Sequence, residues 1–159
     1  MKTMKNRSQQ LRNIFRHMME KGYYPVYEQT HIQFDIDDNI AVVEYNEDIV
    51  SVRLFFSIDE DSYDLFLEAS NMMMLKTYVI KPVILDDMTN IMFSGEFICD
   101  NMRDFKRQFP RIVGRLKEAL NVHKAEMKKL IIASEVVSAT IPATDDHAAG
   151  IGIRHKVLS

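Results

Sequence analysis

The chain has 159 residues, of which 47% are hydrophobic and 27% charged, enough for one compact domain with its own core. Five glycines and four prolines are too few for a collagen-like or broadly disordered protein. The apolar runs are too short to cross a bilayer, and the single Cys99 cannot form a disulfide within the chain, so we expect a cytoplasmic protein without a membrane partner.

The net charge of −3 is distributed unevenly along the chain. Residues 1–22 carry +5, residues 23–100 carry −13, residues 101–132 carry +6, and the remaining residues carry −1. Two basic segments therefore flank an acidic one. We favour the interpretation that these charges face each other within the fold or across a dimer over the interpretation that they form a nucleic-acid face.

The first periodic segment, residues 3–21, predicts an amphipathic helix that ends at Gly22. Three strands follow at residues 32–36, 40–45 and 49–58, separated by turn residues such as Asp37-Asp38-Asn39. In the third strand one face carries the alternating core residues. The other face carries Ile49 and Phe55, which indicates that this face is partly covered.

A second helix is expected from the acidic residues 59–61, which would supply the N-cap and first turn, to about Leu75. Two further strands are expected at residues 77–85 and 91–99. Pro82 cannot donate a ladder hydrogen bond, so it places the first of these strands at a sheet edge or at a bulge.

The last helix begins after a cap at Asp100 or Asn101 and has one apolar stripe, which includes His123. Pro110 predicts either a kink or a short first turn with a restart. Helicity is expected to about Val137. We therefore predict a domain over residues 1–137 and a flexible tail over residues 138–159, which contain Pro142 and two glycines.

The element order α-β-β-β-α-β-β-α predicts an α+β domain with a five-stranded antiparallel sheet and helices packed on it. This order, the Leu11 to Met19 helix, the passage from Val52 to Asp59, and the last helix after Gly95-Glu96-Phe97 resemble the type III secretion chaperone-like fold. The resemblance covers residues 3–130 and is to the bacterial sensory-transduction-regulator family in particular. It implies a dimeric, non-enzymatic module that binds polypeptides or supports regulation.

The sequence contains no motif that fixes a reaction. Nucleophile elbows, phosphate loops and dinucleotide fingerprints are absent, and the five histidines lack the spacing of metal ligands. The carboxylates from Asp35 to Asp38 do not fit a calcium loop, because Ile40 stands where such a loop needs glycine. We expect no enzymatic activity, no cofactor and no metal.

The methionine run at residues 72–74 is unusual, because methionine surfaces adapt to varied apolar partners. We therefore expect a polypeptide partner and a homodimer; the alternative is that these methionines fill an irregular core. The candidate partner-binding residues are Tyr63, Phe66, Met73, Met74, Ile49 and Phe55.

Basic residues recur every three or four positions at the start of the last helix and could form a ridge that contacts phosphates. The ridge comprises Arg103, Lys106, Arg107, Arg111 and Arg115. Because the chain is acidic overall and lacks tryptophan, we favour a solvated helix face, or one paired with the acidic segment. A nucleic-acid-associated regulator is the alternative function.

Overall fold

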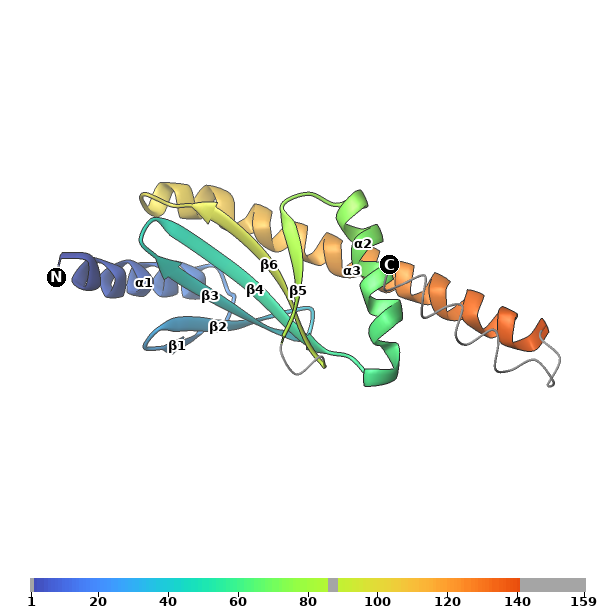
Figure 1. Cartoon of the computed structure of the whole chain (residues 1–159). Helices are drawn as coiled ribbons and strands as arrows, with labels where there is room; N and C mark the ends of the chain where they lie inside the picture. Colours follow the sequence, from blue (N-terminus) through green and yellow to red (C-terminus); the bar gives the residue numbers. More distant parts are fainter. Residues whose placement is uncertain (1, 86–88, 141–159) are drawn as a thin grey trace.

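A computed structural model describes residues 2–85 and 89–140, with side chains from residue 7 onward, and has an α+β fold. Figure 1 shows a twisted sheet with two helices behind it and a third beside its edge. The elements in chain order are α1 (Lys2–Glu20), β1 (Val26–Glu28), β2 (His31–Ile36), β3 (Asn39–Asn46), β4 (Ile49–Ser57), the 3₁₀ helix η1 (Glu60–Ser62), α2 (Tyr63–Lys76), β5 (Ile80–Ile84), β6 (Asn90–Ile98) and α3 (Met102–Thr140).

The sheet of the described residues has six antiparallel strands in the order β1-β2-β3-β4-β6-β5, so the expected number of five is wrong. The missed strand is β1, which pairs with β2 through Val26 and Gln33. Its three residues are too few to establish a two-residue period. The edge position predicted from Pro82 is confirmed, because β5 is the last strand of the sheet.

Two-residue turns fix the register of the first hairpins. Asp37 and Asp38 both have positive φ angles, 48° and 65°, as a type I′ turn requires. The side-chain amide of Asn39 donates a hydrogen bond to the Asp37 carbonyl at 2.9 Å. This turn pairs Ile36 with Asn39 and so sets the register of β2 against β3. Residues that are partners in this register have their side chains on the same face of the sheet.

The core lies on one side of the sheet only. Helices α1 and α3 lie behind the sheet in Figure 1, where α1 contacts β2 and β3 while α3 contacts β4, β5 and β6. The predicted core face of the third strand is confirmed, because Val50, Val52 and Leu54 are fully buried. Gly22 has a φ of 78° and ends α1 as predicted.

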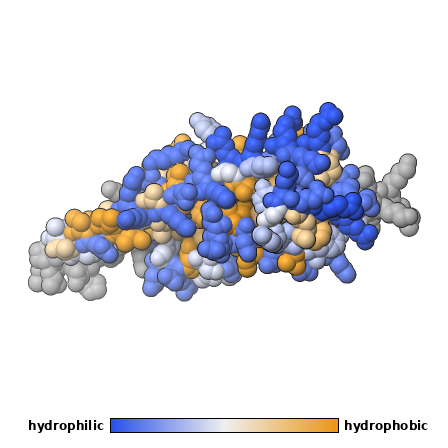
Figure 2. All heavy atoms as spheres, turned by 180° about the vertical axis from the view of Figure 1, so that it is seen from behind, coloured by the Kyte–Doolittle hydropathy of each residue, from blue (hydrophilic) through white to orange (hydrophobic). Residues whose placement is uncertain are grey.

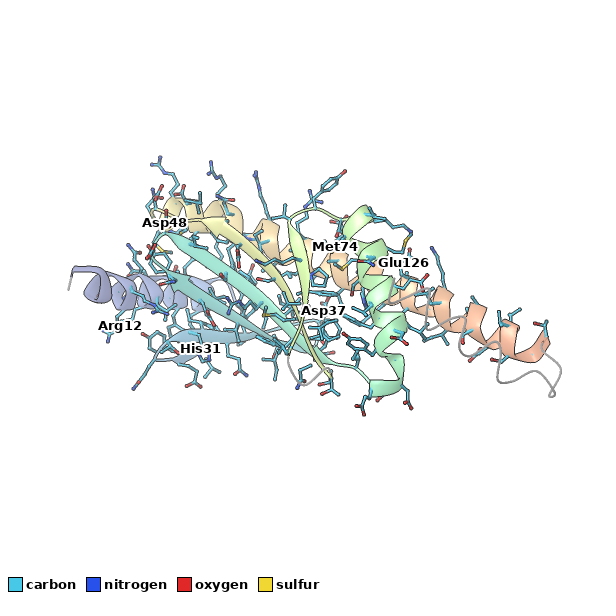
Figure 3. The ribbon with its side chains drawn as sticks, in the orientation of Figure 1. Arg12, His31, Asp37, Asp48, Met74 and Glu126 are labelled. Atoms are coloured by element: carbon cyan, nitrogen blue, oxygen red, sulfur yellow. The ribbon has the colours of Figure 1, made fainter. Side chains whose placement is uncertain are left out.

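Helix α2 packs mainly on α3 rather than on the sheet. The ammonium of Lys76 donates a hydrogen bond to the buried carboxylate of Glu126, which lowers the pKa of Glu126. Figure 3 places Glu126 on α3 and Met74 on α2, near the place where the two helices meet. The expected N-cap position is confirmed for η1, because Asp59 is its N-cap residue and Glu60 and Asp61 lie in its first turn. The Asp59 side chain makes no capping hydrogen bond, and α2 itself begins after η1, at Tyr63.

Helix α3 is continuous through Pro110, so the predicted restart is wrong. Pro110 and Lys106, whose carbonyl would otherwise accept a hydrogen bond from the amide of residue 110, are both exposed, so the missing bond lies on the solvent side of the helix. The predicted cap is confirmed, because Asn101 Oδ1 accepts a hydrogen bond from the Asp104 amide at 3.0 Å.

Helix α3 includes residues 138–140, and the rest of the predicted tail lies outside the described residues. None of the helices described here is long and apolar enough to span a membrane.

Candidate functional site

The face of the sheet opposite the helices, which we call the open face, is covered by none of the described helices. Its residues alternate along each strand with the buried core residues. The strand register arranges them in rows that run across the sheet. Successive rows are separated by two residues, or about 7 Å along each strand.

One row of the open face is apolar across four strands. Phe55 of β4 pairs with Met92 of β6, which pairs with Val83 of β5. Ile40 of β3 extends the row, because the pairing of Ala41 with Leu54 brings it beside Phe55. Ile40 is 51% exposed, and the other three side chains are half-buried. We call Ile40, Phe55, Met92 and Val83 the apolar row.

The middle of the open face is polar and internally paired. The guanidinium of Arg53 lies 3.1 Å from the Glu44 carboxylate, and the ammonium of Lys81 lies 3.3 Å from that of Glu96. Ser94, which pairs with Arg53 across the strands, is buried, and its hydroxyl makes no hydrogen bond with the described residues. A second apolar pair, Ile49 and Ile98, lies beyond this polar zone.

The six predicted partner-binding residues do not form one surface. Ile49 and Phe55 both lie on the open face, Met74 is exposed on α2, and Tyr63 is half-buried at the first residue of α2. Phe66 and Met73 are fully buried, so their assignment to an exposed binding surface is wrong. These two residues are seven positions apart on α2 and point into the core together, whereas Met74 lies about 100° around the helix from Met73.

The five residues of the predicted basic ridge are all exposed. Their ion pairs within the described chain are local, from Arg107 to Asp104 at 3.8 Å and from Arg115 to Glu118 at 3.0 Å. Of the two expected arrangements, pairing with the acidic middle segment does not occur among the described residues, where the carboxylate partners of the ridge lie on α3 itself. The ridge is a solvated face. Figure 2, which views the helix side, shows hydrophilic side chains over much of this layer.

A polar cleft of about 180 Å³ lies between α1 and the start of α3. Arg16 and His17 line it from one helix and Lys106 from the other, together with the acidic Glu20. Burial lowers the pKa of His17, and the charges of Lys106 and Lys21 lower it further. Sequence analysis did not connect α1 to the ridge, because only the packing of the two helices brings these cations together.

No family model matches the chain, and no curated protein matches it in sequence. Among solved structures the chain is similar to YbjN, "a putative transcription regulator from E. coli". The match has a TM-score of 0.59 at 9% identity and covers 75% of this chain and 93% of YbjN. At this identity the match establishes a shared fold, and it supports the distant fold relationship predicted from the element order.

Proposed function

We propose that the protein is a non-enzymatic module of the bacterial cytoplasm that binds a polypeptide partner on the open face and acts as a chaperone, adaptor or regulator. The apolar row is the observation that carries this proposal. Contiguous apolar side chains on an otherwise polar surface are typical of interaction sites. The similarity to YbjN and the resemblance to the sensory-transduction-regulator family support a regulatory role for such a module.

Because the apolar row runs across the strands of the open face, it suits an extended or helical segment of the partner that lies across the strands. Phe55 and Met92 would provide the apolar contacts, since adaptable thioether and aromatic side chains are enriched at such interfaces. The exposed charged pair Lys81–Glu96 would supply polar contacts beside them. The expected homodimer stays a prediction.

The test is a pair of substitutions in the apolar row, Ile40→Glu and Met92→Glu. A partner is first isolated by affinity capture from the native cytoplasm and identified by mass spectrometry, and the purified pair is then titrated by calorimetry. We expect the double variant to bind at least about 30-fold more weakly, because a carboxylate buried in an apolar contact costs about 2 kcal/mol or more.

Gln33→Glu with His31→Glu is the matched control, because it adds two carboxylates to the same face outside the apolar row. Circular dichroism should give the same fold for both double variants. A partner that binds both variants equally well, or the recovery of no protein partner, contradicts the proposal.

A nucleic-acid-associated regulator is the second candidate function. The exposure of the whole basic ridge favours it, as does its continuation across the polar cleft to Arg16 on α1. Two basic helices side by side can contact the phosphates of one backbone. The description of YbjN as a transcription regulator is consistent with this alternative.

Arg107→Glu with Arg111→Glu tests the alternative in a salt titration of binding to duplex DNA or RNA. If the ridge contacts phosphates, the double variant should lose binding, because each phosphate contact contributes about 0.9 to the salt slope. The control is Lys81→Glu with Lys124→Glu, which changes the net charge by the same amount outside the basic ridge and should retain binding to the nucleic acid. Equal losses for both pairs would instead indicate a response to net charge alone.

A further inference from the structure

A groove of about 450 Å³ lies between the end of β4 and the second half of α3, on the opposite face of the sheet from the apolar row. From α3 it is lined at every turn between Leu120 and Ile131, a length of about 17 Å. Phe56 and Ile58 line the opposite wall. A volume of this size with mostly apolar walls is typical of small-molecule sites.

The floor of the groove is uncharged. Phe66 and His123 lie there, with their ring centres 4.4 Å apart. The imidazole Nε2 of His123 lies 3.4 Å from the Ser70 hydroxyl, so this nitrogen already has a polar neighbour. Burial lowers the pKa of His123 to about 4, which keeps the ring neutral at physiological pH. The floor therefore favours an apolar chain over a polar head group.

The rim of the groove on α3 is cationic. Lys124 and Lys128 line it one helical turn apart, and neither forms an ion pair with any of the residues described. The neighbouring Lys129, in contrast, lies 3.4 Å from the Glu126 carboxylate. The opposite wall ends in the neutral Ser57 and Asn39. The two ammonium groups can therefore converge on one anion at the mouth of the groove.

We propose that this groove binds an amphipathic carboxylate of the fatty-acid class. The alkyl chain lies along α3 against Phe56 and Met127, and the carboxylate lies between Lys124 and Lys128. The apolar walls provide the affinity, and the lysine pair selects an anion over a cation with the same chain. This site is independent of the open face, so either proposal can fail without the other.

The chain contains no tryptophan, so Ile131→Trp places a single tryptophan at the groove, which can be excited selectively over the six tyrosines. Ile131 is 41% exposed, which leaves room for the larger side chain. Titration with monomeric dodecanoate should give a saturable, one-to-one blue shift. Dodecyltrimethylammonium, which has the same chain and the opposite charge, should bind at least about tenfold more weakly. Calorimetry with the unsubstituted protein should reproduce the preference.

Lys124→Gln with Lys128→Gln should weaken dodecanoate binding at least about fivefold and leave the binding of dodecanol unchanged. Lys117→Gln with Lys129→Gln is the matched control, because it removes the same charge from α3 outside the groove and should retain dodecanoate binding. Absence of saturation, equal binding of the cation, or an equal loss in the control pair overturns the proposal. A response to phosphatidylglycerol vesicles without a response to monomeric dodecanoate overturns it in favour of adsorption to a lipid surface.

Discussion

Acidification from pH 6.5 to pH 4 is expected to lower the free energy of unfolding by about 3 kcal/mol through His123 alone. His123 is buried on α3, with ring centres 5.4 Å from Phe93 and 6.1 Å from Phe56. This apolar surrounding disfavours the imidazolium and lowers the pKa from 6.5 to about 4. Between these two pH values the unfolded chain binds a proton that the folded chain does not. Stability therefore falls as the pH falls through this interval.

His123→Leu should remove this pH dependence, as measured by urea unfolding at several pH values. The interval from pH 5 to 6.5 excludes Glu126, which has a lowered pKa and loses its contribution only as the pH falls below the ordinary carboxyl value of 4.5. His17 also has a lowered pKa and adds the same slope to both proteins, so the difference between the wild-type and variant slopes measures His123. Ser70→Ala is the control: it removes the polar neighbour of His123 but leaves the burial that causes the shift, so its slope should match the wild type. A His123→Leu variant that keeps the wild-type slope would contradict the explanation.

Much of the fold follows from local patterns in the sequence. The alternation of Val50, Val52 and Leu54 identifies a strand with one buried face. Asn101 is a cap residue that the sequence predicts, and in the structure its side chain caps the start of α3. Pro82 correctly predicts an edge, because the missing backbone donor excludes it from the sheet interior. These features depend on neighbouring residues only, which is why the sequence suffices.

The candidate sites depend on contacts between distant residues. Ile40, Phe55, Met92 and Val83 form one row only through the register of three strand pairs, and no local pattern predicts that register. The Lys76–Glu126 pair joins residues 50 positions apart, so the burial of Glu126 on a charged helix was not foreseeable. Similarly, the spacing of Phe66 and Met73 predicts a helix face but not whether that face meets a partner or the core.

Substitution by alanine, which adds one methyl group, should change the free energy of unfolding in opposite directions at Gly95 and at Gly114. A Cβ at Gly95 on β6 would lie 2.9 Å from Ile112 Cγ2 and 2.9 Å from Ile80 Cδ1. The Ile80 atom is at the end of its side chain and can rotate away. Ile112 Cγ2 is attached directly to Cβ and moves chiefly with the α3 backbone. Gly95→Ala should therefore cost about 1–3 kcal/mol of stability.

At Gly114, inside α3, an added Cβ meets no atom within 4 Å, so Gly114→Ala should raise stability by about 1 kcal/mol through helix propensity. Urea unfolding of both variants measures the difference. A double-mutant cycle then locates the cause: Ile112→Ala removes the obstructing methyl, so Gly95→Ala should cost much less in that background than in the wild type. If the cost is the same in both backgrounds, α3 does not contact β6 at Gly95 as the structure places it. Loss of the extra cost in the Ile112→Ala background would establish that the absence of a side chain at this position sets how closely the last helix packs on the sheet.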